Sequence, residues 1–151
     1  FWVTLMIVAI AAGVIFLIYE MSRPKVMLHL GDGIFTARVA MTDSERTKGL
    51  SGVKELPKDK AMLFVFDQDG KHGIRMKDME IPIDVVWLDR ERRVVYIARE
   101  VLPESYPEVY RSNIAARYVV EFAAGTVQEK AIRIGMTAQF NEEMLKEDVG
   151  W

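Results

Sequence analysis

Charged side chains between residues 45 and 84 have the types and spacing of a site for a small polar molecule. Glu45 and Arg46 stand at the start of a predicted short helix, and Lys77 and Asp84 lie close to a predicted strand. Arg46 and Lys77 could hold anionic or hydroxyl groups, such as those of a sugar, because both side chains are positively charged hydrogen-bond donors. We therefore predict a candidate ligand cleft formed by Arg46, Lys77 and Asp84.

The same residues also have a purely structural interpretation. Thr42-Asp43-Ser44-Glu45 has the pattern of a capping box, in which the first and last side chains accept hydrogen bonds from backbone amides at a helix start. Arg46 could then pair with Asp84, and Lys77 could extend into solvent. We keep both interpretations, and the structural one is favoured, most clearly for Glu45.

Several kinds of chemistry lack the residues that they require. The chain has no Cys, which excludes disulfides, thiolate metal sites and Cys nucleophiles. Its two histidines, His29 and His72, lie on different predicted elements, so we expect no metal site. No Ser-His-Asp arrangement and no phosphate-binding loop are present. We therefore predict no catalytic residues, no cofactor and no enzymatic activity.

The charge balance argues against a nucleic-acid partner. The chain has 151 residues, of which 20 are basic and 22 acidic, and its net charge is −2. Surfaces that bind nucleic acid normally have an excess of basic residues. The scarcity of Asn and Gln beside plentiful charge is typical of proteins from hot environments.

Short strands separated by turns dominate the chain after residue 25. Residues 26–30 and 34–40 are predicted to pair as a hairpin around Gly31-Asp32-Gly33. Further strands are predicted at residues 61–66, 85–89, 94–101 and 118–122, and residues 137–140 are expected to close the sheet. Capping boxes at residues 42–45 and 126–129 each predict a short helix. The predicted fold class is mainly β (α+β), a compact barrel- or sandwich-like domain with two short helices.

A long loop at residues 103–113 is rich in Pro and Tyr. Long ordered loops often carry function, so we expect an exposed contact here without assigning its role.

The first 19 residues are apolar and carry no charged side chain. As a helix they would span about 28 Å, close to the hydrocarbon thickness of a bilayer. Three interpretations are an uncleaved secretory signal, a membrane anchor and the core helix of a filament. An anchor is less favoured because Arg23 and Lys25 would keep the rest of the chain in the cytoplasm. We predict two parts, a hydrophobic helix at residues 1–25 and a β-rich domain at residues 26–151.

The sequence begins with Phe and not with Met, has no basic leader, and continues as an unbroken apolar run. This pattern is similar to the mature N-terminus of type IV pilin-like subunits. Bacterial pilins usually carry Glu at the fifth position, where this chain has Leu5, so the resemblance is to the archaeal type. The residues expected to pack parallel copies of the helix together are Phe1, Leu5, Ala9, Gly13 and Phe16.

Four sequence blocks after residue 35 carry a second resemblance. They are Thr42-x-x-Glu45-Arg46-x-x-Gly49-Leu50, Met62-Leu63-Phe64-x-Phe66, Met76-Lys77-x-x-x-Ile81-Pro82-x-Asp84, and Tyr118-Val119-x-Glu121 with Gly125. In order and spacing they resemble the family called domain of unknown function 192. The resemblance implies a β-rich fold, often exported or attached to a membrane, and no particular activity. The chain departs from the family at Arg75, Asp78 and Met79, where relatives have Trp, Asn and Thr, which puts the ancestral ligand in doubt.

Two functions follow from these observations. The leading prediction is a structural subunit of an extracellular pilus-like filament, with the apolar helix in the filament core and the β-rich domain on its surface. Its partners would be copies of itself and, before assembly, the membrane, with no nucleic acid. The alternative is a membrane-anchored extracytoplasmic module that binds a small ligand. An open pocket at Arg46 and Lys77 would favour the alternative, and a filled one would favour the filament.

Overall fold

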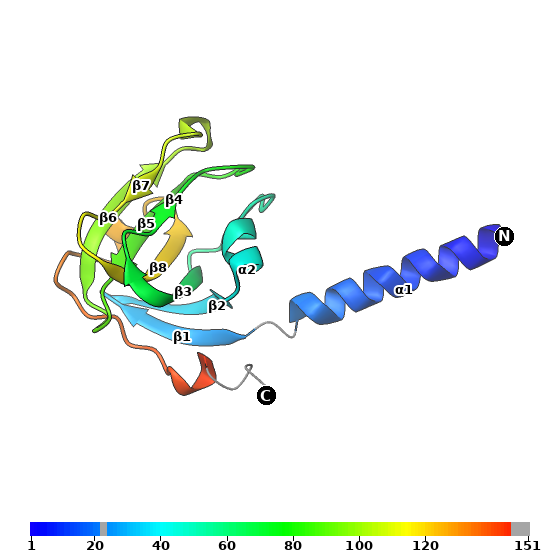
Figure 1. The fold of residues 1–151 in the computed structure, drawn as a ribbon, viewed down its shortest axis with the longest axis horizontal. Coiled ribbons are helices and arrows are strands. Elements are labelled where there is room, and N and C mark those ends of the chain that lie inside the picture. Colours follow the sequence, from blue (N-terminus) through cyan, green and yellow to red (C-terminus); the bar gives the residue numbers. More distant parts are fainter. Residues whose placement is uncertain (22–23, 146–151) are drawn as a thin grey trace.

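A six-stranded sheet is the centre of the fold (Figure 1). The computed structural model describes residues 1–21 and 24–145, without the side chains of residues 16, 19–21 and 144. In spatial order the strands are β1 (Lys25–Leu30), β2 (Gly33–Ala40), β3 (Lys60–Gly70), β8 (Ala116–Ala123), β5 (Ile83–Leu88) and β6 (Val94–Val101). β2 and β3 pair in parallel through a crossover, and the other neighbours are antiparallel. The mainly β class predicted from the sequence is confirmed.

Two strands of two residues form a separate ribbon. β4 (Gly73–Ile74) pairs with β7 (Tyr110–Arg111) in antiparallel register. β7 lies within the long loop at residues 103–113, which also contains the short 3-10 helix η1 (Pro103–Ser105). The loop is therefore an ordered part of the fold that returns to the segment after β3.

The short helices show one correct capping prediction and one wrong one. At α2 (Asp43–Lys48), Thr42 Oγ1 accepts a hydrogen bond from Glu45 N at 3.2 Å, and Glu45 Oε2 accepts one from Thr42 N at 3.0 Å, so this capping box is confirmed. At α3 (Thr126–Glu129), the cap position is Gly125 and no side chain of its own caps the helix. Thr126 Oγ1 is instead buried, with no hydrogen-bond partner among the described residues.

The sheet does not close into a barrel, because its edge strands β1 and β6 do not pair. Residues 137–139 lie between these edges. Gln139 exchanges two backbone hydrogen bonds of 2.9 Å with His29 of β1, and Ala138 N donates to Arg92 O, close to β6, at 2.9 Å. The predicted closing segment therefore joins the edges through isolated bridges and does not form a strand. A further 3-10 helix, η2 (Glu143–Leu145), follows it.

Apolar side chains fill both faces of the sheet. One face carries the first core, which includes Leu28, Phe35, Leu63, Val120 and Phe122. The other face carries the second core, which includes Met62, Phe64, Val85, Trp87 and Val119. Successive side chains of a strand point to opposite faces, so β8 directs Glu121 to the face of the second core.

The N-terminal helix α1 (Trp2–Met21) precedes the sheet. Leu5, Ala9 and Gly13 are exposed on it, and the side chain of Phe16 lies outside the described residues, as does Arg23. Across the described stretches of the chain, no helix combines the length and the apolar character that crossing a membrane requires. The predicted membrane-length helix is therefore not found in the described residues.

Candidate functional site

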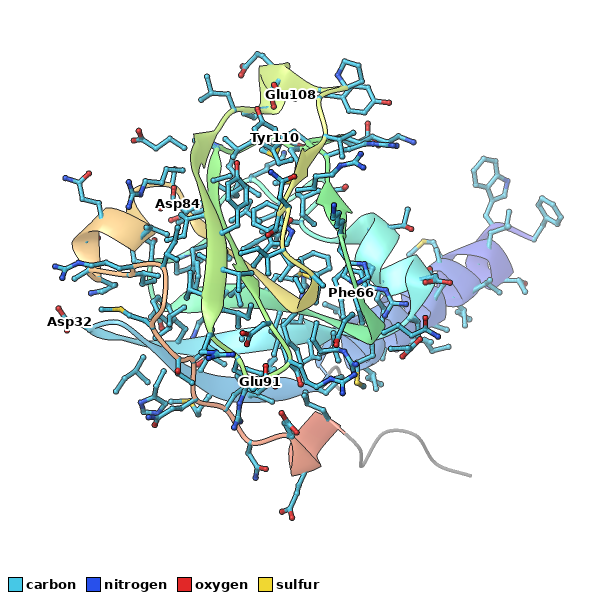
Figure 2. All side chains as sticks on the ribbon, turned by 60° about the vertical axis from the view of Figure 1, so that its left-hand side comes forward. Asp32, Phe66, Asp84, Glu91, Glu108 and Tyr110 are labelled. Atoms are coloured by element: carbon cyan, nitrogen blue, oxygen red, sulfur yellow. The ribbon has the colours of Figure 1, made fainter. Side chains whose placement is uncertain are left out.

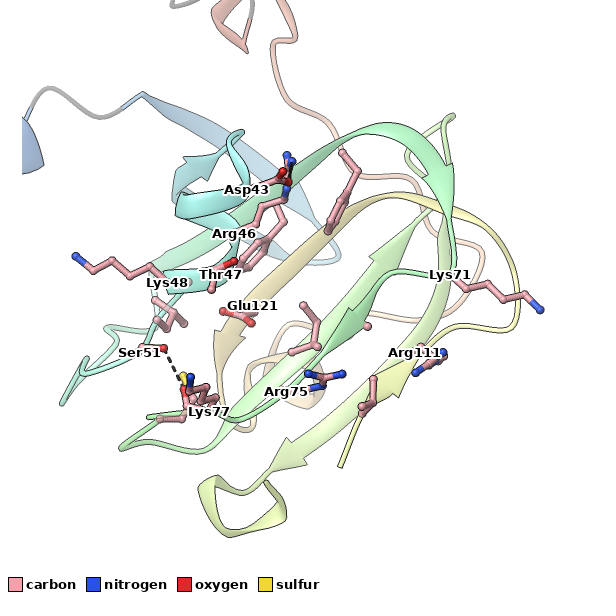
Figure 3. A pocket seen from close by; sticks show the side chains of 18 residues that line it. Asp43, Arg46, Thr47, Lys48, Ser51, Lys71, Arg75, Lys77, Arg111 and Glu121 are labelled. Atoms are coloured by element: carbon pink, nitrogen blue, oxygen red, sulfur yellow. Dashed lines mark hydrogen bonds and ion pairs between the residues drawn. The ribbon is translucent and has the colours of Figure 1, made fainter. Parts of the chain in front are cut away.

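A pocket of about 590 Å³ opens between α2, the segment at residues 71–79 and β7 (Figure 3). Small-molecule sites typically enclose about 300–1,000 Å³. Six apolar side chains form much of its wall: Leu50, Phe64, Phe66, Ile74, Met79 and Val109. The pocket therefore has the size and the mixed lining of a site for a small organic molecule.

Arg46 fixes one side of the pocket by tying α2 to β3. Its Nη1 donates to Val65 O at 2.6 Å and also to Met41 O, and its Nη2 donates to Asp43 Oδ1 at 2.6 Å. The guanidinium carbon lies 5.2 Å from the centroid of the Phe66 ring. The acidic partner of Arg46 is thus Asp43 and not Asp84, and much of its donor capacity is used within the fold.

Lys77 is held at the opposite rim by its backbone. Ser51 Oγ donates to Lys77 O at 3.0 Å, the contact drawn as a dashed line in Figure 3. Gly52 N donates to Asp78 O at 2.9 Å. The turn after α2 is therefore bonded to the segment that carries Lys77, while the Lys77 side chain stays exposed.

The rim of the pocket carries an excess of positive charge. Arg75, Lys77 and Arg111 are exposed pocket residues, and within residues 1–21 and 24–145 none of them has a side-chain hydrogen bond or an ion pair. Lys71 shares these properties, but Figure 3 shows its side chain extending outward, as that of Lys48 does at the other end. An anion in the pocket would meet cations that have no acidic partner in the described fold.

Glu121 is the buried polar group of this pocket. Its side chain is 4% exposed, and its Oε2 has no hydrogen-bond partner among the described residues. The residues paired with it on the neighbouring strands are Met62 and Val85, both apolar. Burial raises the pKa of the Glu121 carboxyl to about 8, so at neutral pH the group is mostly protonated.

Sequence reasoning did not select Glu121 as a site residue, although a signal was present. It is the single charged residue in the predicted strand 118–122, which is otherwise apolar or aromatic. A carboxyl in such a strand must be paired, neutral or functional, because burying an unpaired charge is costly. That argument would have pointed to Glu121.

Asp84 lies on the other face of the sheet. It pairs in register with Phe122 of the first core, and its carboxylate accepts hydrogen bonds from Glu100 N and Val127 N, each at 2.8 Å. Figure 2 shows it beside α3. The structure thus brings Arg46 and Lys77 to one pocket and puts Asp84 elsewhere, in a structural role. That Arg46 and Lys77 bind a ligand stays a prediction.

The far wall of the pocket depends on Gly73. A Cβ atom at this position would lie 2.6 Å from Val109 Cγ1, closer than side-chain carbons approach. The neighbouring His72 stacks on Phe66, with ring centroids 3.6 Å apart, and its carbonyl oxygen accepts a hydrogen bond from Trp87 Nε1 at 2.8 Å. The loop at residues 103–113 therefore supplies a pocket wall, which its sequence did not indicate.

The family of the chain is decided by its match over residues 26–140 to the model of DUF192, described as an uncharacterized ACR. The chain belongs to the DUF192 family. This confirms the second resemblance found in the sequence, and the match covers the pocket and all of the sheet except Lys25.

Two solved structures share the fold of this DUF192 chain. One, from Sinorhizobium meliloti 1021, is described as a candidate transcription regulator; it is 24% identical, with a TM-score of 0.72, over 79% of this chain and 94% of that one. The other, a protein of unknown function from Novosphingobium aromaticivorans DSM 12444, is 23% identical, with a TM-score of 0.71, over 76% of this chain and 83% of that one. Similarity at this identity shows the fold alone. None of the curated proteins compared with the chain matches it.

The prediction of a pilus-like filament subunit is wrong. The chain matches the DUF192 model over residues 26–140, and neither that family nor the two structures that share its fold are described as pilins. The physical reason for the error is that a run of apolar residues indicates only that the segment avoids water. It does not indicate what the segment packs against.

Proposed function

We propose that this DUF192 domain binds a small organic anion in the pocket between α2 and β7. The observation that carries the proposal is the group of cations at Arg75, Lys77 and Arg111, which surround one pocket without acidic partners in the described part of the chain. They come from two segments far apart in the sequence, so the fold itself assembles them. Asp43, one of the two acidic residues of the lining, is already paired with Arg46.

The apolar wall supports an organic ligand over a bare inorganic ion. Phe64, Ile74 and Leu50 are buried, and Phe66 is partly buried, so the inner part of the pocket offers little to a hydrated ion. Burying apolar ligand surface contributes roughly 25 cal/mol per Å². A compact ligand with an aromatic or aliphatic body and one phosphate or carboxylate group would use both parts of the lining.

We expected an open pocket at Arg46 and Lys77 if the chain is a binding module, and the pocket is open. The proposal is limited to ligand binding without a chemical step. Attachment to a membrane, a cell-surface location, the absence of a nucleic-acid partner and the absence of a cofactor or metal stay predictions, and the proposal does not depend on them.

Phenyl phosphate is a suitable probe, because it joins an aromatic ring to a phosphate dianion. Calorimetric titration of the whole chain with phenyl phosphate should show saturable binding that weakens as salt is raised. The double variant Arg75→Gln/Lys77→Gln should lower the affinity about tenfold, since two exposed cations each contribute up to about 1 kcal/mol.

The matched control is Lys54→Gln/Arg133→Gln. It removes the same charge from two exposed positions outside the pocket lining. The proposal fails if both double variants bind phenyl phosphate equally well, or if the unmodified chain does not bind it at millimolar concentration.

A further inference from the structure

We propose that the Glu121 carboxyl is the specificity-determining hydrogen-bond donor of this pocket, and that the ligand carries an uncharged acceptor oxygen at the end remote from its anionic group. This inference rests on the proposed function and adds the chemistry of the inner end of the ligand. Its motivation is geometric, because a carboxyl that is 4% exposed faces the pocket with Oε2 unpartnered in the described structure.

The surroundings of Glu121 select its neutral form. Its strand neighbours Met62 and Val85 are apolar and supply no hydrogen bond. Cationic side chains line the same pocket, yet none forms an ion pair with Glu121 within the described residues. A buried carboxyl without a counter-charge is most stable when protonated.

The charged residues that line the pocket, apart from Glu121, come from three elements. They are Asp43, Arg46 and Lys48 on α2, Lys71, Arg75 and Lys77 on the segment around β4, and Arg111 on β7. Asp43 and Arg46 satisfy each other. Burial is the cause of the raised pKa of Glu121, about 8, and these groups do not offset it.

A protonated carboxyl offers one O–H donor, and leaving it unmet in a desolvated site is costly. A ligand carbonyl, ether or hydroxyl oxygen satisfies that donor without introducing a charge. An ammonium group would instead require the ionised carboxylate. The cations at the rim and the protonated carboxyl of Glu121 thus favour a ligand with an anion at one end and an uncharged oxygen at the other.

Two probes of similar length separate these cases. 4-Acetylphenyl phosphate presents a carbonyl oxygen opposite its phosphate, and 4-(aminomethyl)phenyl phosphate presents an ammonium. At about pH 7 we expect the acetyl probe to bind about tenfold more tightly than the aminomethyl probe, as one buried hydrogen bond with a correctly charged partner would give.

The pH dependence provides a test that needs no substitution. If only protonated Glu121 binds the acetyl group, the affinity should follow the fraction of chains in which Glu121 is protonated. It should then fall about tenfold between about pH 7 and about pH 9. The phosphate second ionisation lies near pH 6, below this range.

Glu121→Gln keeps a neutral donor of the same size. This variant should retain the affinity for the acetyl probe and lose its pH dependence, while Glu121→Met should bind the acetyl probe no better than phenyl phosphate. Because Glu121→Gln shares all other titrating groups, it also corrects for ionisation at the lysines.

Distinct outcomes separate the two proposals. Tighter binding of the aminomethyl probe, or identical pH profiles for the unmodified chain and Glu121→Gln, would overturn the role of Glu121. In that case, if Arg75→Gln/Lys77→Gln still lowers the affinity for phenyl phosphate, the proposal of anion binding is retained. If neither probe binds, both proposals are rejected.

Discussion

Asp84 and Glu121 are buried carboxyls on the adjacent strands β5 and β8, and they point to opposite faces of the same sheet. Asp84 accepts two backbone hydrogen bonds, whereas Glu121 Oε2 accepts none from the described residues. The difference separates a structural carboxyl from one that is available to a ligand. We therefore expect substitutions of Asp84 and of Glu121 to have different effects.

Replacing Asp84 should destabilise the fold without weakening the pocket. Asp84→Ala leaves the amides of Glu100 and Val127 without their acceptor, which should lower the free energy of unfolding by about 2–4 kcal/mol. Urea denaturation measures this change, and Asp67→Ala, at an exposed position, should cost less than about 0.5 kcal/mol. Equal stabilities for the two variants, or lost phenyl phosphate binding in folded Asp84→Ala, would contradict the structural role.

Replacing Glu121 should instead change how stability depends on pH. The pKa of its carboxyl is about 8 in the folded chain and near 4.5 in the unfolded chain, so the folded state holds more protons between these values. The stabilising contribution is therefore complete below about pH 4.5 and is lost as pH rises to about 8, by up to about 1.4 kcal/mol per pH unit.

Glu121→Gln removes that dependence, so its stability relative to the unmodified chain should rise steadily between about pH 5 and about pH 8. Denaturation profiles at several pH values measure the difference. Glu80→Gln, which removes an exposed carboxyl, should follow the unmodified chain. Parallel profiles for Glu121→Gln and the unmodified chain would show that Glu121 is ionised in the folded state at neutral pH.

The pocket wall makes a third prediction, at Gly73. Gly73→Ala forces a methyl group against Val109 and should cost about 1–3 kcal/mol in stability, with weaker phenyl phosphate binding. Adding Val109→Ala removes the clash, so the double variant should recover most of both losses. A cycle built with Val109→Ala alone measures the coupling energy, and a value near zero would mean that β4 and β7 can separate without affecting the pocket.

Local patterns predicted the local structure well. The hairpin predicted around Gly31-Asp32-Gly33 is present, and its turn is one residue shorter than predicted because Gly33 already pairs with Leu30. The capping box at Thr42 succeeded because all its hydrogen bonds form within residues 41–45. The same pattern at Thr126 failed because Asp84, distant in sequence, provides the acceptor for Val127 N. Sequence spacing carries no information about a partner on another strand.

The candidate site was predicted only in part, because sequence spacing does not show which side chains the fold brings together. Arg46 and Lys77 were chosen for their charge, and the fold brings both to the pocket. Asp84 was chosen because it, like Lys77, lies close to a predicted strand, but strand alternation directs it to the opposite face. The ribbon of β4 and β7 could not be predicted, because two-residue strands show no periodicity and their pairing joins segments far apart in the chain.

The bridges made by residues 137–139 also affect the order in which the chain folds during synthesis. The backbone N–H and C=O of His29 in β1 have their partners only after Gln139, more than a hundred residues later, has been added. Contacts of such long sequence separation form slowly, and chains emerge from N-terminus to C-terminus during synthesis. The hairpin of β1 and β2 is therefore made early, yet its outer edge stays open to other extended chains until almost the whole domain has been translated.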